Sequence, residues 1–172
     1  DAGSICAAHP VTMMEASGRS RRARRMVWRA CRTASAVTVS SGATLSLQGY
    51  SNTIGSLAGA GTVNLGSSRL AVGTDNTTTI FSGLLTDAGS SANRGSLTKS
   101  GLGTLVLSNS SNDFGGNVSI VRGQLVAVGA GSLGSSTGTI TVGGDGAVGG
   151  GSLLLTSVGG LGFNGTAPTL TR

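Results

Sequence analysis

The chain has 172 residues, of which 31 are glycine, 3% are aromatic and 10% are charged, whereas an average globular protein has about 7% glycine and about 25% charged residues. The net charge of +6 is gathered in residues 1–36, where seven arginines face two acids, so residues 37–172 carry only +1 and lack the basic face by which a folded domain binds nucleic acid. Scarce aromatics leave Leu, Val, Ile and Ala to build the core, and no apolar run approaches the ~20 residues of a membrane-spanning helix.

Residues 1–36 are expected to form a basic leader of little structure. The stretch SGRSRRARRMVWRACRTASA is rich in arginine and has neither a helical nor a strand period. Two other interpretations stay open: a remnant of a targeting peptide, suggested by Ala34-Ser35-Ala36, and a nucleic-acid-binding arm. The apolar segment of about 7–15 residues that a signal peptide needs is missing, which favours a disordered or non-native leader.

From residue 37 the chain changes into short β-rich runs separated by Gly, Ser, Asn and Asp. Many runs alternate between apolar and polar residues, which is the period of a strand with one buried face. No window has the 3.6-residue period of an amphipathic helix, so the sequence predicts an all-β domain over residues 37–172. The expected strands are Val37–Val39, Thr44–Leu47, Thr62–Leu65, Arg69–Val72, Thr77–Phe81, Ser96–Thr98, Thr104–Leu107, Val118–Val121, Gln124–Val128, Thr139–Val142 and Ser152–Leu155.

Three segments, beginning at Val37, Val118 and Ile140, look like versions of one unit: a short alternating strand, a corner that ends in glycine, and a second apolar strand. The last two begin 22 residues apart, which suits one coil of a solenoid whose strands stack on their equivalents in the next coil. Glycine suits such corners because it adopts left-handed backbone conformations without a Cβ penalty. The expected architecture is a parallel β-helix.

Residues 95–125 resemble the autotransporter-associated β-strand repeat, also called the passenger-associated transport repeat. The segment GSLTKSGLGTLVLS, followed by an Asn-x-Phe-Gly-Gly turn, matches the usual order of strand, glycine corner, strand and turn. Asp113 stands where the family commonly has Thr, and the basic leader has no counterpart in the family. The matching positions, for which structural roles are expected, are Leu97, Lys99, Gly101, Gly103, Leu105, Leu107, Asn112, Phe114, Gly115, Gly116, Gly123 and Leu125.

The resemblance implies a right-handed parallel β-helix from the passenger of a Gram-negative autotransporter, exported across the outer membrane to the cell surface. The implied function is a non-enzymatic stalk that supports secretion by folding coil by coil, and the implied partner is the parent protein's outer-membrane β-barrel, expected beyond this chain. The alternative is an adhesin that binds glycan, matrix or sister cells. Exposed end coils also predict some self-association.

No catalytic residue is predicted. Hydrolysis by a Ser/His/Asp arrangement needs an imidazole, and the one histidine, His9, lies in the leader. The four aspartates of residues 37–172 fall in expected turns, where aspartate is mostly structural. A polysaccharide-cleaving enzyme, which would need a carboxylate pair, is therefore the least favoured class.

No cofactor or metal ion is predicted either. Cys6, His9 and Cys31 make only a weak zinc pattern, because the third ligand is distant from the first two. The segment Gly143-Gly144-Asp145-Gly146 resembles a calcium-binding repeat but occurs once, so it is interpreted as a glycine-rich corner.

Lys99 is the one charged residue within GSLTKSGLGTLVLS. It has two interpretations: a ligand contact on the solenoid face, or an outward strand position whose charge prevents edge-to-edge pairing. With Leu97 facing in, Thr98 facing out and a turn at Gly101, the outward structural role is the favoured expectation.

Overall fold

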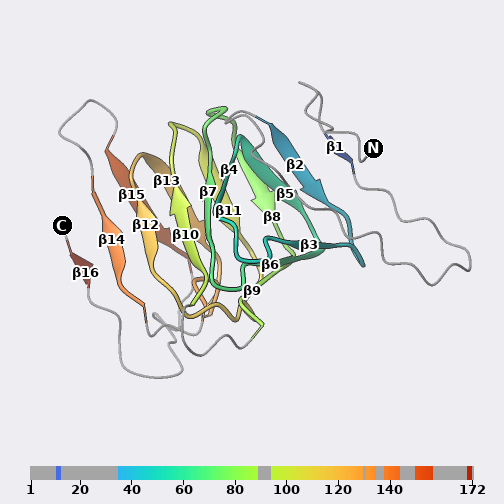
Figure 1. Ribbon diagram of the computed structural model, residues 1–172. Helices are drawn as coiled ribbons and strands as arrows, with labels where there is room; N and C mark the ends of the chain where they lie inside the picture. Colours follow the sequence, from blue (N-terminus) through green and yellow to red (C-terminus); the bar gives the residue numbers. More distant parts are fainter. Residues whose placement is uncertain are drawn as a thin grey trace, which may run out of the picture.

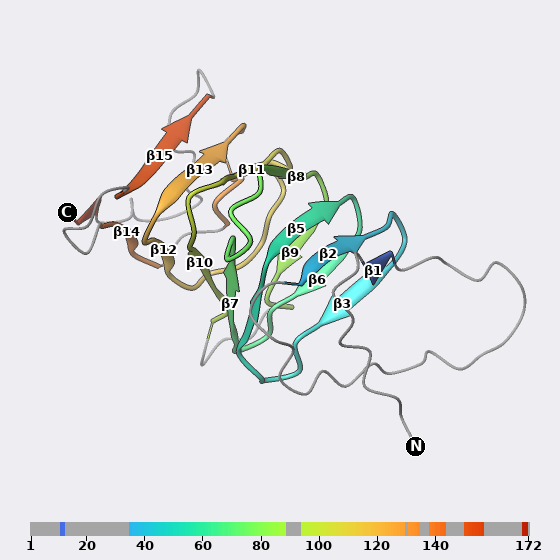
Figure 2. The ribbon, with the colours of Figure 1, turned by 90° about the horizontal axis from the view of Figure 1, so that it is seen from above.

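The computed structural model describes residues 35–88, 94–129, 131–134, 138–143 and 150–156, together with the backbone at 11–12 and 170–171. Three sheets of parallel strands wind into a solenoid of about four turns (Figures 1 and 2). The described residues contain no helix, so the prediction of an all-β parallel solenoid is confirmed. Accordingly, no helix that could span a membrane occurs in the part of the chain that is described.

Within each sheet, neighbouring strands come from successive coils, so the strands are stacked along the solenoid axis. The seven-stranded sheet contains β1 (Val11–Thr12), β2 (Ala36–Val39), β5 (Ser56–Gly59), β8 (Thr79–Phe81), β11 (Thr104–Leu107), β13 (Gly123–Ala127) and β15 (Gly151–Leu155). The six-stranded sheet contains β4 (Asn52–Ile54), β7 (Arg69–Val72), β10 (Ser96–Lys99), β12 (Val118–Ile120), β14 (Ile140–Val142) and β16 (Leu170–Thr171). The three-stranded sheet contains β3 (Thr44–Ser46), β6 (Thr62–Asn64) and β9 (Leu84–Thr86).

One coil visits all three sheets in turn, as β2, β3 and β4 do at the start of the solenoid. The next coils repeat this order with β5, β6 and β7, and then with β8, β9 and β10. In the following coil, between β11 and β12, an isolated parallel bridge from Asp113 to Thr86 takes the place of a strand in the three-stranded sheet. Each coil therefore hydrogen-bonds to its neighbours through backbone groups.

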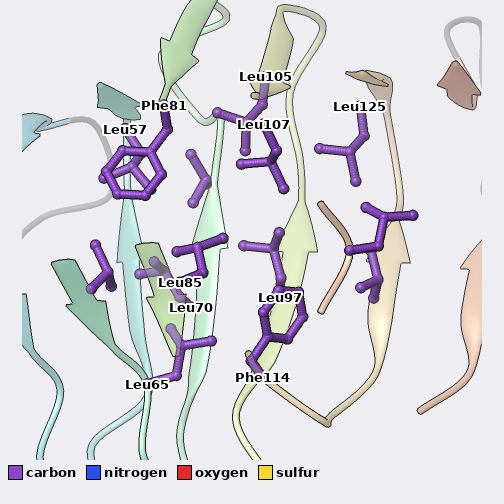
Figure 3. Close-up of a cluster of buried hydrophobic side chains, with 14 of the residues drawn as sticks. Leu57, Leu65, Leu70, Phe81, Leu85, Leu97, Leu105, Leu107, Phe114 and Leu125 are labelled. Atoms are coloured by element: carbon purple, nitrogen blue, oxygen red, sulfur yellow. The ribbon is translucent and has the colours of Figure 1, made fainter. Parts of the chain in front are cut away.

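The core is lined by every second residue of strands such as β2, β10 and β11. In β11, Leu105 and Leu107 are buried, whereas Thr104 and Val106 point to the outer face. Because the strands stack in register, Leu105 lies beside Leu125 of the next coil, and rows of leucine line the interior (Figure 3). Burial of one such leucine stabilises the fold by roughly 1.5–3 kcal/mol.

The predicted 22-residue coil is confirmed for two of the three proposed units. Val118 of β12 pairs with Ile140 of β14 in the six-stranded sheet. The unit at Val37 is different, because β2 belongs to the seven-stranded sheet and leads into another corner. The expected second apolar strand of the last unit, at residues 147–148, lies outside the described residues, and the next described strand, β15, begins at Gly151.

Among the strands between residues 35 and 156, three were not expected from the sequence: β4, β5 and β9. Each has three or four residues, and β5 (Ser56–Gly59) combines one leucine with Ser, Ala and Gly. So short a segment is stabilised by pairing with adjacent coils rather than by its own composition.

In the leader, Val11–Thr12 forms β1, which pairs with Val37–Thr38 of β2. This pairing differs from the expected lack of structure at that position. The leader's other residues before Ser35 lie outside the described residues, and the division into 1–36 and 37–172 stays a prediction.

Candidate functional site

The expectation for Lys99 was wrong: its side chain points into the solenoid. The residue is 1% exposed, and β10 alternates so that Lys99 lies on the same face as Leu97. The physical reason is the two-residue period itself, which places residues 97 and 99 on one side of the strand.

The buried ammonium of Lys99 is surrounded by backbone carbonyl groups. Nζ donates hydrogen bonds to the carbonyl oxygens of Ser100 at 2.6 Å and Gly101 at 2.9 Å. A third, longer bond of 3.4 Å reaches the carbonyl oxygen of Arg122 at the equivalent corner of the next coil. An ammonium has three protons to donate, so these acceptors match its full capacity. Lys99, its three carbonyl partners and Asp75 are called the Lys99 corner below.

Glycines allow the coils to approach closely at this corner. Gly101 has a φ of +68°, and a Cβ atom there would collide with the carbonyl oxygen of Gly73 in the preceding coil. Gly123 has a φ of +66°, and a Cβ atom there would meet the carbonyl oxygens of Gly101 and Gly103. A side chain at these positions would separate the carbonyl groups that Lys99 joins.

Asp75 supplies the negative charge that acts on Lys99. Burial lowers the pKa of Lys99, and Coulombic attraction to Asp75 offsets part of that decrease. For Asp75, burial alone would raise the pKa, but hydrogen bonds from the Ser56 side chain, from the backbone and hydroxyl of Thr77, and from its own backbone outweigh burial and lower it. Thr77 Oγ1 donates to Asp75 Oδ1 at 2.8 Å.

A second connection between coils is made by Asn112, a residue of the repeat that is 5% exposed. Its Oδ1 accepts a hydrogen bond of 2.9 Å from the backbone nitrogen of Leu85 in the preceding coil. Its Nδ2 donates a bond of 2.7 Å to the carbonyl oxygen of Ser132 in the following coil. A buried amide that satisfies a donor and an acceptor in this way joins three coils.

The turn after Asn112 is packed against the same region of the solenoid. Phe114 is fully buried, and Figure 3 shows its ring in the interior near Leu97. The backbone nitrogen of Gly115 donates to Asp87 Oδ2 at 3.0 Å, and that of Gly116 donates to the Gly95 carbonyl oxygen at 3.0 Å. Asp87 and Asp75 were not predicted as partners of the repeat, because they precede it by about one coil.

The other candidate groups are not brought together by the described structure. Cys6, His9 and Cys31 lie outside the described residues, as do Gly144, Asp145 and Gly146 of the suggested calcium corner. Within the described ranges, no three His, Cys, Asp or Glu side chains are grouped so that they could hold a metal ion. Of the aromatic residues that are described, Phe81 and Phe114 are buried, and Tyr50 is 65% exposed.

The Lys99 corner joins two successive coils through hydrogen bonds. A lysine with a lowered pKa can act as a nucleophile, but only where a substrate can reach its amine. Here the amine is buried and its hydrogen bonds end on backbone carbonyls, which ties the two coils together.

These features define a parallel β-solenoid whose repeat segment carries buried polar connections between coils. No family model, no curated protein and no solved structure matches this chain.

Proposed function

We propose that this chain is a structural stalk segment of a bacterial surface protein of the autotransporter type. The observation that carries the proposal is the position of Lys99: its buried ammonium donates hydrogen bonds to backbone carbonyls of two successive coils. The resemblance of residues 95–125 to the passenger-associated transport repeat supports the secretory context. The proposal includes a location at the cell surface and no enzymatic activity.

The proposed mechanism is stepwise stacking of coils. In a solenoid, each coil contacts mainly its neighbours, so folding can propagate along the chain from any folded coil. Parallel pairing between adjacent coils provides such a template, and Lys99 and Asn112 add side-chain connections to it. Folding outside the outer membrane would then oppose backward movement of the chain through the parent protein's β-barrel.

A secretion assay tests this proposal directly. The full 172-residue chain is placed upstream of an autotransporter barrel in a Gram-negative host, and surface exposure is followed by accessibility to added protease. A Gly/Ser-rich segment of equal length is the unfolded control, and Lys99→Met tests the corner.

We expect the chain to reach the surface faster than the Gly/Ser segment, and Lys99→Met to reduce this advantage. Equal rates for the chain and the unfolded segment would contradict a role for folding in export. Saturable binding of the purified chain to glycans or to cells would instead support the adhesin alternative.

A further inference from the structure

The described row of interior residues that contains Lys99 is otherwise aliphatic. Lys99 pairs with Val72 in the preceding coil and with Ile120 in the next, and the row continues to Ile54 and Val142. Ile54, Val72 and Ile120 are buried. A lysine in such a row buries its hydrocarbon stem among aliphatic neighbours, and only its ammonium requires polar partners. The groups around the Nζ atom therefore distinguish this coil from the adjacent ones.

The groups that accept hydrogen bonds from Nζ are backbone carbonyl oxygens. They belong to Ser100, Gly101 and Arg122, at 2.6, 2.9 and 3.4 Å, and they come from two successive coils. Asp75 adds a negative charge that attracts the ammonium. Carbonyl oxygens that surround one point can replace the hydration shell of a monovalent cation. The corner thus supplies oxygen atoms and negative charge that do not depend on the side chain at residue 99.

The three carbonyl oxygens suit an ammonium ion better than they suit a water molecule. Water donates only two hydrogen bonds, so one buried acceptor would stay unsatisfied, whereas an ammonium can donate to all three. Their positions are set by the backbone of the corner, where Gly101 and Gly123 have φ values of +68° and +66°. The arrangement of acceptors should therefore persist when the lysine side chain is removed.

We propose that the Lys99 corner is a binding site for a primary ammonium ion, and that the Lys99 side chain is its covalently attached occupant. The variant Lys99→Ala leaves a space that is flanked by Val72 and Ile120 and ends at the three carbonyl oxygens. Propylammonium contains the three carbon atoms and the nitrogen that this substitution removes. The ligand class is therefore a short primary alkylammonium ion. This inference is independent of the proposed function.

The test is urea unfolding of the full chain carrying Lys99→Ala, at neutral pH, with propylammonium chloride added up to about 100 mM. Sodium chloride at the same concentration controls for ionic strength. The neutral molecule 1-propanol, which has the same number of carbon atoms, controls for simple filling of an apolar space. Ile120→Ala, at the paired position of the next coil, is the matched cavity variant, and the wild type is the chain whose site is already filled.

We expect propylammonium to raise the urea midpoint of Lys99→Ala. At about 100 mM it should increase the ratio of folded to unfolded chains about tenfold, which corresponds to a dissociation constant of about 10 mM. Ethylammonium and butylammonium should be less effective, because one is too short to span the space and the other too long to fit it. The wild type and Ile120→Ala should not respond, and neither sodium chloride nor 1-propanol should replace propylammonium.

A stability of Lys99→Ala that does not depend on propylammonium overturns the proposal, and indicates that water or a movement of the coils satisfies the carbonyl groups. An equal effect of sodium chloride or 1-propanol, or an equal response of Ile120→Ala, overturns it too, because the effect would then not come from an ammonium at this corner. If Lys99→Ala is unfolded in buffer, circular dichroism during addition of propylammonium replaces the urea measurement. Recovery of the β signal supports the site, and no recovery contradicts it.

Discussion

The ammonium of Lys99 donates a hydrogen bond to the carbonyl oxygen of Arg122, 23 residues further along the chain and one coil away. The same side chain is attracted by Asp75, which lies in the preceding coil. A single buried side chain thus interacts with groups from both neighbouring coils, as Asn112 does a little further along the chain.

The first prediction concerns removal of the buried ammonium. Lys99→Met keeps a long side chain but leaves the carbonyl groups of Ser100, Gly101 and Arg122 without this donor. Replacement of both partners of a buried polar pair can be neutral, but here the acceptors remain, and an unsatisfied buried group costs about 1–3 kcal/mol. We expect the free energy of unfolding in urea to fall by about that amount. Thr98→Ala, on the outer face of the same strand, is the control and should change it by less than about 0.5 kcal/mol.

The second prediction concerns alkaline pH. Burial holds the pKa of Lys99 below its usual 10.5, so the unfolded chain binds this proton more tightly than the folded one. The stability of the wild type relative to Lys99→Met should therefore rise with pH between the folded-state pKa and 10.5, and should then level off. Urea unfolding of both proteins at several alkaline pH values measures this difference. A difference that shrinks with rising pH would show that the folded pKa is raised instead.

The third prediction concerns Asp75 and acid. Its pKa is lowered from 3.8 because its hydrogen bonds outweigh the effect of burial, so its stabilising contribution is present above 3.8 and is lost as the pH falls below that value. Asp75→Asn should reduce stability at neutral pH and should make unfolding less dependent on acid. The control is Asp113→Asn, which replaces an exposed aspartate. Circular dichroism during acid titration measures the unfolding of the wild type and of both variants. Identical acid transitions for the wild type and Asp75→Asn would contradict this role.

The fourth prediction compares two glycines with positive φ. Gly101 and Gly49 have φ values of +68° and +88°, so a left-handed backbone at either position costs an alanine about 1–2 kcal/mol. A Cβ at Gly49 meets nothing within 4 Å, whereas a Cβ at Gly101 collides with the Gly73 carbonyl oxygen. Gly101→Ala should destabilise the chain by roughly 1–3 kcal/mol more than Gly49→Ala, because the two coils must move apart. The measurement is the melting temperature of each variant. Equal decreases for Gly101→Ala and Gly49→Ala would show that a Cβ atom fits at Gly101 without separating the coils.

The fifth prediction concerns the amide of Asn112. Asn112→Ala removes the acceptor of the Leu85 backbone nitrogen and the donor to the Ser132 carbonyl oxygen, each worth about 1–3 kcal/mol when left unpaired and buried. Asn109→Ala, which loses a single local bond to the Ser111 nitrogen, is the matched control. We expect the first variant to be clearly less stable in urea than the second. Similar losses would mean that water replaces the partners of Asn112.

The fold was predictable where a short run of strand-favouring residues is bounded by glycine and serine. Thr104–Leu107, which lies between Gly103 and Ser108, was predicted with the bounds that β11 has. The strand β5 was missed, since Ser56, Ala58 and Gly59 around one leucine look like a loop in sequence. Such a segment becomes a strand because coils on either side provide its hydrogen-bond partners.

The candidate site was less predictable than the fold. Lys99 and Asn112 were both predicted to be structural residues of the repeat. The inward position of Lys99 was not predicted, although Lys99 lies two residues after the inward-facing Leu97 and therefore on the same face of the strand. Its partner Asp75 could not be found from spacing, because coil lengths vary. Leu97 pairs with Leu70 and Val118, which lie 27 and 21 residues away.

The position of Lys99 between two coils also limits how the solenoid can grow or be shortened. When its own coil is the last one formed, the Arg122 carbonyl is missing, and when the preceding coil is missing, Asp75 is absent. The coil that contains Lys99 is therefore completed only as the middle member of three. A chain that is cut between the Lys99 coil and either of its two neighbours loses the Arg122 carbonyl or Asp75, so the Lys99 coil would be a poorly stabilised end for the solenoid.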